Sequence, residues 1–204
     1  MLDLIRDSVR RAMRSVARAL DRVSGGSISP NTITIVGFLM HIPIAGLIAA
    51  GYFGYAALLL IIFGLFDTLD GELARLQKRA SAAGMLLDAS TDRMKEVLLY
   101  IGSAYALADA GKVHVAAWAV AACGASICVS YIKAKGETAV KDKGLTPNEI
   151  NRLFQDGLGR FEVRMALLVA GLLTNQLLPV LIIITVLSTY TAFERLIKIS
   201  KKLG

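Results

Sequence analysis

The stretch "FDTLDGELARLQKRASAAGMLLDASTDR", residues 66–93, decides both the fold and the position of the candidate site. It continues directly from the apolar run "YAALLLIIFGLF" and carries four aspartates, Asp67, Asp70, Asp88 and Asp92. Carboxylates at bilayer depth are costly in free energy and are usually kept where a partner neutralises them. The four aspartates are therefore candidate functional residues.

The composition favours a membrane protein, because 55% of the 204 residues are hydrophobic, more than an ordinary soluble domain carries. Several apolar stretches approach the about 20 residues that cross hydrocarbon. They lie at roughly 32–54, 55–68, 94–110, 113–132, 163–174 and 177–193. We extend the second stretch as a helix to about residue 79. We begin the third at about residue 84, because aspartates occupy the inner ends of both helices. The prediction is an all-α integral membrane fold with six transmembrane helices.

The net charge of +7 is distributed by membrane side. Basic residues precede the first span, separate spans two from three and four from five, and follow the last span, whereas the opposite connections hold a single lysine. The positive-inside rule then places both termini and the aspartates on the cytoplasmic side of the plasma membrane. No basic patch interleaved with aromatic residues remains, so nucleic acid is not an expected partner.

The N-terminal residues 1–23 are expected to form an amphipathic helix at the membrane interface, because apolar residues recur there at three- and four-residue steps. A solvated helix packed on the protein is the alternative. Pro30 is placed to start the first span, and residues 31–200 are expected to form the six-helix bundle. Pro147 is expected to open a short helix in the polar linker. The whole chain, 1–204, is predicted to be one membrane domain.

The aspartates are spaced for helices. Asp67 and Asp70 share a helix face at three residues apart, as do Asp88 and Asp92 at four apart. A chain reversal between the two helices would gather all four carboxylates, and Gly84 would allow a close approach. Such charges repel unless cations neutralise them. All-oxygen ligation without clustered His or Cys favours Mg²⁺ or Mn²⁺ over zinc.

The residues around the aspartates suit a ligand that carries phosphate. A site with two metal ions clamps the attacking and leaving oxygens of a displacement at phosphorus. Gly71 and Ala74 lack bulk on the first aspartate helix, Arg75 can pair with phosphate oxygens, and Ser81 can add a hydroxyl from the turn. Phosphate chemistry at the inner membrane surface is the expectation.

Residues 67–75, "DTLDGELAR", then eight residues, then residues 84–92, "GMLLDASTD", match in full the signature of the CDP-alcohol phosphotransferase family. That signature is D-x-x-D-G-x-x-A-R, eight residues, G-x-x-x-D-x-x-x-D, and its fixed spacing makes it far more specific than a lone glycine motif. Six spans, an interfacial N-terminal helix and cytoplasmic termini also resemble this family. The resemblance therefore covers essentially the whole chain.

The resemblance implies an enzyme of phospholipid synthesis in which the hydroxyl of a small alcohol displaces CMP from a CDP-linked lipid, CDP-diacylglycerol or an archaeal equivalent. It implies that Asp67, Asp70 and Asp88 hold two metal ions at the donor diphosphate. Asp92 would be a further ligand and the general base for the acceptor hydroxyl. A homodimer is also implied. The positions that would bind the donor are Asn31, Thr34, Gly71, Ala74, Arg75, Ser81 and Gly84.

The acceptor is indicated by "SYIKAKGE", residues 130–137, which is similar to a "SYxKAR-E" segment of phosphatidylinositol-phosphate synthases within that family. A phosphorylated acceptor needs fixed positive charge, which Lys133, Arg160 and Arg195 could supply. Their alternative role is to contact anionic headgroups. The synthases' "R-P-E-R" segment appears here as "GRFEVR", without the proline. Inositol phosphate is thus the favoured acceptor, and glycerol 3-phosphate or serine remain open.

The acidic residues could also serve two other roles. The aspartates could pair helices in a scaffold, neutralised by Lys78, Arg79 or Arg93, and Glu72 and Glu96 outside the signature are expected to be surface or pairing charges. Acids within spans would also suit a small cation transporter. A transporter gives no reason for Gly71, Arg75 and Gly84 at their spacings, whereas Gly84 and Ala74 could also serve close helix packing.

Overall fold

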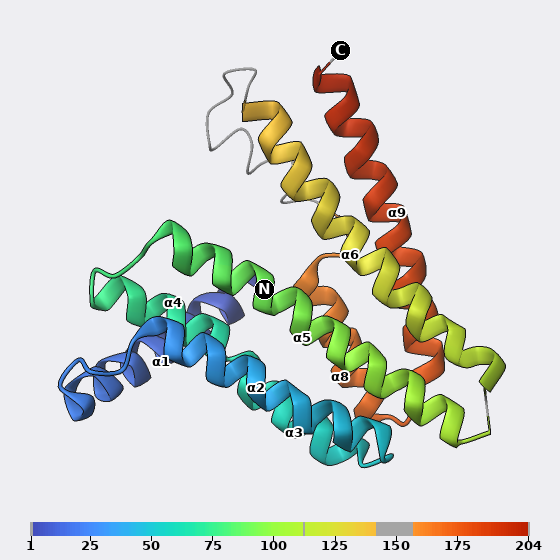
Figure 1. The fold of residues 1–204 in the computed structure, drawn as a ribbon, viewed down its shortest axis with the longest axis horizontal. Coiled ribbons are helices and arrows are strands. Elements are labelled where there is room, and N and C mark those ends of the chain that lie inside the picture. The colour runs from blue at the N-terminus through green and yellow to red at the C-terminus, as the bar shows by residue number, and fades with distance from the viewer. Residues whose placement is uncertain (1, 112, 142–156, 204) are drawn as a thin grey trace.

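The computed structural model describes residues 2–111, 113–141 and 157–203, and Figure 1 shows that they form a bundle of helices. Within these ranges no strand occurs, so the predicted all-α fold is confirmed. The short helix expected at Pro147 lies outside the described residues. The helices are α1 (Leu2–Ser24), α2 (Pro30–Ala49), α3 (Phe53–Gly64), α4 (Phe66–Leu76), α5 (Ala82–Asp109), α6 (Val113–Lys141), α8 (Phe161–Leu173) and α9 (Leu177–Leu203).

Four helical segments are long and apolar enough to cross a membrane. They are Pro30–Ala49, Phe53–Leu76, Val113–Ala139 and Leu177–Leu203. α5 is long enough but carries the charged site residues in its first half. α8 has 13 residues, or about 20 Å of helix, which is less than the about 30 Å of hydrocarbon in a bilayer.

Hydroxyl caps fix where two of the site helices begin. Ser29 precedes Pro30, and its hydroxyl accepts the Thr32 N–H at 3.2 Å. Proline suits this first helical position because its missing N–H would have no partner there. The hydroxyl of Ser81 accepts the Gly84 N–H at 3.1 Å in the same way at the start of α5. The chain therefore reverses between α4 and α5 close to where the sequence places the turn.

The second predicted helix is interrupted at one point. α3 ends at Gly64 and α4 begins at Phe66, where the sequence analysis expects one continuous helix. Gly64 weakens the helix here because glycine loses more backbone entropy than other residues on ordering. Phe66 then packs on α2, where a Cβ on Gly37 would lie 3.3 Å from its Cβ.

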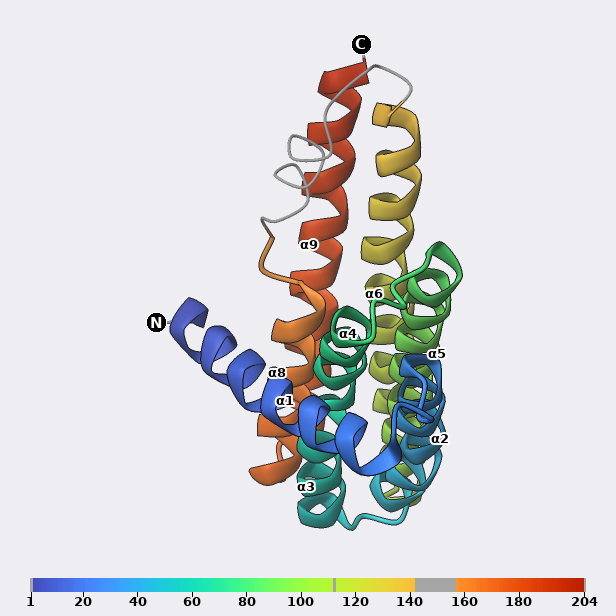
Figure 2. The same ribbon diagram turned by 90° about the vertical axis from the view of Figure 1, so that its left-hand side faces the viewer.

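Close helix contacts hold α2, α4 and α5 together at the site. α2 packs on both α4 and α5. A Cβ added to Gly102 of α5 would lie 2.4 Å from the Ala45 carbonyl oxygen of α2, so only glycine fits this approach. α1 crosses α4 at an angle to the bundle, with Ala17 fully buried against Leu69 and Leu73 (Figure 2).

α6 and α9 run side by side and extend beyond the residues where α8 begins, as both ribbon views show. α8 therefore begins well inside the bundle, next to the middle of α9. The N–H of Gly159, just before α8, donates to the Thr191 hydroxyl of α9 at 2.8 Å. The start of α8 also lies beside the aspartate segment of α5, because the Arg93 guanidinium is 4.7 Å from the centre of the Phe161 ring.

Candidate metal and donor-binding site

α4 and α5 bring three of the four aspartates together. Carboxylate oxygens of Asp67, Asp70 and Asp88 all lie within 4.8 Å of one another. Asp92, one turn beyond Asp88 on α5, is not part of this group of oxygens and contacts Lys95 and Arg93. The convergence expected from the three- and four-residue spacings is therefore present, with Asp92 at its edge.

The three grouped aspartates fit a hard divalent cation. The Oδ1 atom of Asp88 is buried and has no hydrogen-bond partner, and a buried polar atom of that kind calls for a bound group. Asp70 is buried and accepts a hydrogen bond of 2.6 Å from the Thr34 hydroxyl. Oxygen-only ligands are those that Mg²⁺ and Mn²⁺ prefer. The donor set thus suits the ions that the sequence predicts.

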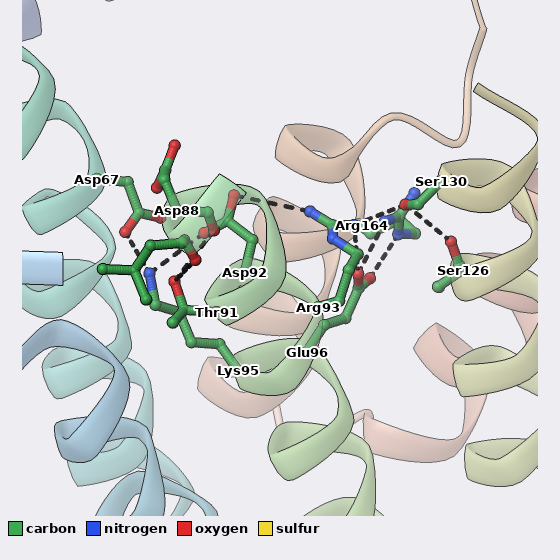
Figure 3. Close-up of polar contacts among 11 residues, drawn as sticks. Asp67, Asp88, Thr91, Asp92, Arg93, Lys95, Glu96, Ser126, Ser130 and Arg164 are labelled. Atoms are coloured by element: carbon green, nitrogen blue, oxygen red, sulfur yellow. Dashed lines mark hydrogen bonds and ion pairs between the residues drawn. The ribbon is translucent and has the colours of Figure 1, made fainter. Parts of the chain in front are cut away.

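Lys95 is a site residue that the sequence analysis missed. Its Nζ lies 2.5 Å from Asp67 Oδ1 and 3.2 Å from Asp92 Oδ1, so it bridges α4 and α5 (Figure 3). Its side chain is only 2% exposed. A signal was available, because Lys95 follows Asp92 by three residues and so shares its helix face.

The predicted donor-binding residues gather around the same end of these helices. A Cβ on Gly84 would lie 3.2 Å from the Ser81 hydroxyl and 3.3 Å from the Asn31 side-chain oxygen, so these three residues adjoin. A Cβ on Gly71 would lie 3.6 Å from the Arg75 guanidinium. Ala74 follows on the same helix and is half-buried. Thr34 reaches the site through its bond to Asp70.

Arg75 and Glu72 form an ion pair beside the aspartates. Arg75 Nη2 lies 2.7 Å from Glu72 Oε1, and Arg14 Nε of α1 lies 3.1 Å from Glu72 Oε2. Glu72 is therefore a pairing charge, one of the two roles expected for it. The side chain of Arg75 is 58% exposed, which leaves its guanidinium accessible to an anionic ligand. Ser81, also a predicted donor-binding residue, has a structural role too, because its hydroxyl caps the start of α5.

A second polar cluster, which we call the Glu96 network, lies further along α5. Arg164 of α8 donates to both carboxylate oxygens of Glu96, at 2.6 and 2.9 Å, and both side chains are 1% exposed. Arg93 also donates to Glu96, at 2.9 Å, and to the Ser130 hydroxyl of α6 at 2.8 Å. Figure 3 shows the network beside the aspartates. The Tyr100 hydroxyl lies between Glu96 and Ser126.

Of the three cations that the helix-pairing alternative would use, Arg93 has a described contact with an aspartate, and that contact lies within α5. Arg93 Nη2 lies 3.8 Å from Asp92 Oδ2, and its guanidinium carbon lies 4.7 Å from the centre of the Phe161 ring. Arg79 instead donates to the Gly26 carbonyl and to Gln77.

The three candidate acceptor residues come from α6, α9 and the start of α8. Arg195 of α9 is buried and donates to the Val129 carbonyl of α6 at 3.2 Å. Lys133 lies one turn after Val129, is 49% exposed and has its Nζ 3.7 Å from Glu137. Arg160 directly follows Gly159, which is bonded to α9 one turn before Arg195. The contacts thus connect the elements that carry the three basic residues.

Comparison with known sequences identifies related proteins. A family model described as CDP-alcohol phosphatidyltransferase matches residues 27–193. The archaetidylinositol phosphate synthase of Methanothermobacter thermautotrophicus is 26% identical over 209 residues, covering 100% of this chain and 96% of the relative. The phosphatidylinositol phosphate synthase of Corynebacterium glutamicum is 35% identical over 116 residues, covering 55% of this chain and 52% of the relative.

A third relative is larger. The bifunctional IPC transferase and DIPP synthase of Rubrobacter xylanophilus is 30% identical over 175 residues, which cover 85% of this chain and 38% of that protein. The chain thus spans about two fifths of the Rubrobacter protein and about half of the Corynebacterium one.

Solved structures share the fold. The crystal structure of Mycobacterium tuberculosis phosphatidylinositol phosphate synthase with CDP-DAG bound has a TM-score of 0.78 and 24% identity, covering 93% of this chain and 94% of that one. The same enzyme in complex with manganese and citrate has a TM-score of 0.76 and 24% identity, covering 92% and 88%.

Proposed function

The chain belongs to the CDP-alcohol phosphatidyltransferase family, which makes it a transferase, and from this premise we propose the reaction that it catalyses. It transfers a phosphatidyl-type group from CDP-diacylglycerol or a similar CDP-linked lipid to the hydroxyl of a small polar alcohol. CMP is the leaving group, and the product is a phospholipid. The observation that carries the proposal is the gathering of Asp67, Asp70 and Asp88 oxygens from two helices within 4.8 Å.

Asp67, Asp70 and Asp88 would hold two Mg²⁺ or Mn²⁺ ions, with Asp92 as a further ligand. Bound divalent ions supply neutralising charge for the donor diphosphate and for the charge that develops at phosphorus. The partnerless Asp88 oxygen supports this assignment. The mycobacterial relative crystallised with manganese gives independent support for a divalent ion in this fold.

The protein's own residues bind the donor and move one proton. Arg75 offers an accessible guanidinium to the diphosphate, and Asn31 and Ser81 offer polar groups beside Gly84. Asp92 accepts the proton of the acceptor hydroxyl as that oxygen bonds to the phosphorus on the lipid side. The bond between this phosphorus and the CMP oxygen breaks, and CMP departs with the bonding electrons. The contact of Lys95 with Asp92 favours the ionised carboxylate that a base requires.

Inositol phosphate is the proposed acceptor, and Lys133, Arg160 and Arg195 would bind its phosphate. Two arguments support this choice: the basic residues lie on connected elements, and the relatives include phosphatidylinositol and archaetidylinositol phosphate synthases. Glycerol 3-phosphate and serine are the alternative acceptors, because the "GRFEVR" segment lacks the synthases' proline. All three offer a hydroxyl for the same displacement.

The chain is an integral membrane protein, for which we propose six transmembrane helices: the four long apolar segments plus α5 and α8. α8 has 13 residues and begins beside the middle of α9, so it would cover only part of the hydrocarbon. α5 qualifies because its second half is apolar and its charged half belongs to the site. The basic connections put the site and both termini on the cytoplasmic side of the plasma membrane. α1 would lie in the interface, with Val16 and Val23 exposed for lipid contact. Residues 1–204 would form one domain that assembles as a homodimer.

The test is an acceptor panel. Purified protein is incubated with CDP-diacylglycerol, Mg²⁺ and, separately, inositol phosphate, glycerol 3-phosphate or serine, and the lipid product is identified by mass spectrometry. We expect CMP release and a phosphatidylinositol phosphate product with the first acceptor. Product only with glycerol 3-phosphate or serine would reassign the acceptor, and no CMP release with any of them would overturn the proposed reaction. Divalent-ion flux into proteoliposomes without CMP release would favour the transporter alternative instead.

A further inference from the structure

Lys95 is a buried cation set among the carboxylates of the site, and it lies outside the family signature. An ammonium has three N–H donors, and two of them are directed to Asp67 and Asp92 at 2.5 and 3.2 Å. With only 2% of its side chain exposed, Lys95 cannot turn away into water without moving its helix. The site therefore contains a fixed positive charge of its own.

The Lys95 charge separates the four aspartates into two pairs with different surroundings. Among the described residues, neither Asp70 nor Asp88 forms a hydrogen bond or a close ion pair with Lys95. Asp88 lies near enough to be attracted by the Lys95 charge, but its Oδ1 atom has no hydrogen-bond partner. Asp67 and Asp92 already share the ammonium. A divalent ion that uses the second pair must approach Lys95 or displace it, and like charges a few ångströms apart in a partly dry site repel strongly. Asp70 and Asp88 are thus expected to bind a divalent ion more readily than Asp67 and Asp92.

We propose that Lys95 makes the two metal-binding steps unequal and couples the second to the donor. The first ion binds at Asp70 and Asp88 with help from Asp67, and the second binds tightly only when a nucleoside diphosphate brings negative charge to offset Lys95. Lys95 is accordingly a positioning residue that acts through Asp67 and Asp92. This inference rests on the proposed function, because it assumes the two-ion site.

The test measures Mn²⁺ binding and needs no turnover. The full chain in detergent is titrated with Mn²⁺, and the free ion is followed by electron paramagnetic resonance, with and without CDP. For the wild type we expect two classes of site, the weaker tightened at least about tenfold by CDP. In Lys95→Met the weaker class should tighten by at least about tenfold without CDP. Lys95→Arg keeps the charge and should keep the wild-type pattern.

Lys201→Met is the matched control, because Lys201 is exposed in the last turn of α9 and far along the chain from the site. It should leave both Mn²⁺ constants unchanged. Size-exclusion chromatography and circular dichroism report whether Lys95→Met folds. If it does not, the wild type still decides, because two equal steps in the absence of CDP would overturn the inference.

The results also separate this inference from the proposed function. Unchanged or weakened Mn²⁺ binding in folded Lys95→Met, alongside normal CMP release by the wild type, would overturn the role of Lys95 alone. No Mn²⁺ binding to the wild type, with or without CDP, would overturn the two-ion site and this inference together.

Discussion

The aspartate site and the Glu96 network lie next to each other along α5, yet their charges are balanced in opposite ways (Figure 3). The site has four carboxylates and one buried ammonium, and the buried Oδ1 atom of Asp88 has no hydrogen-bond partner. In the network, two guanidiniums pair with the one carboxylate of Glu96. An excess of acid leaves room for bound cations, whereas a paired acid holds helices together.

The network also connects the rest of the bundle to the proposed base. Arg164 links α8 to Glu96, and Arg93 links the same carboxylate to Ser130 of α6. Arg93 follows Asp92 directly in the chain and lies 3.8 Å from it. Paired charges therefore fix the position of α5 at Asp92, beside the region where charge is left unpaired.

The largest expected effect comes from removing the proposed base. Asp92→Asn keeps the size of the side chain but cannot take a proton, so the rate of CMP release should fall by about 10²- to 10⁴-fold. Donor binding should change much less. The control is Asp109→Asn, the same substitution at the exposed far end of α5, which should retain activity. Full activity in Asp92→Asn would mean that another group accepts the proton.

Breaking the Glu96 network should have the next largest effect, which is a loss of stability. Arg164→Leu leaves the buried Glu96 with Arg93 as its one charged partner in the described network, beside the Tyr100 hydroxyl. Losing one partner of a buried ion pair typically lowers the free energy of unfolding by about 3–5 kcal/mol. Denaturant unfolding in detergent measures it, with Arg79→Leu as the exposed control. The double variant Glu96→Gln with Arg164→Leu should recover part of the loss. If Arg164→Leu were as stable as the wild type, the Glu96 network would not hold the helices together as the comparison requires.

Divalent ions should stabilise the site but not the network. At a Mg²⁺ concentration a hundredfold above its dissociation constant, the wild type should gain about 2.7 kcal/mol in the free energy of unfolding. Asp70→Asn should lose most of this gain, whereas the network variant Arg164→Leu should keep it. Equal gains in Asp70→Asn and the wild type would place the stabilising ion elsewhere.

The smallest expected effect is a gain in stability in the absence of divalent ions. Without divalent ions, Asp88→Asn removes a charge that is repelled by Asp92 and whose Oδ1 atom has no hydrogen-bond partner, so the protein should become more stable by about 1 kcal/mol. The same unfolding assay, run with a metal chelator, detects it. A loss of stability would show that Asp88 has a favourable partner in the free protein.

The sequence predicted the features that depend on local spacing. Aspartates three and four residues apart share a helix face, and a short turn between two helices brings the faces together, so the grouping of Asp67, Asp70 and Asp88 followed from periodicity. The all-helical fold followed from the long apolar runs. Both inferences use rules that act over one or two helical turns.

Contacts between distant residues could not be obtained in this way. Glu96 and Arg164 lie 68 residues apart, and which of many charges pair depends on how helices pack. Lys95 lies outside the signature, although its distance from Asp92 gave a local hint. The interruption at Leu65 was also missed, because a glycine in an apolar helix only weakens it and packing decides whether it breaks.

The central claim is that Asp67, Asp70 and Asp88 share divalent ions, and locating those ions tests it most directly. Crystals of the full chain grown with Mn²⁺ and CDP would be measured for anomalous scattering at an energy that identifies manganese. The account predicts a manganese peak among the carboxylates of these three aspartates. A map with no peak there, or with peaks only at other acidic residues, would contradict it.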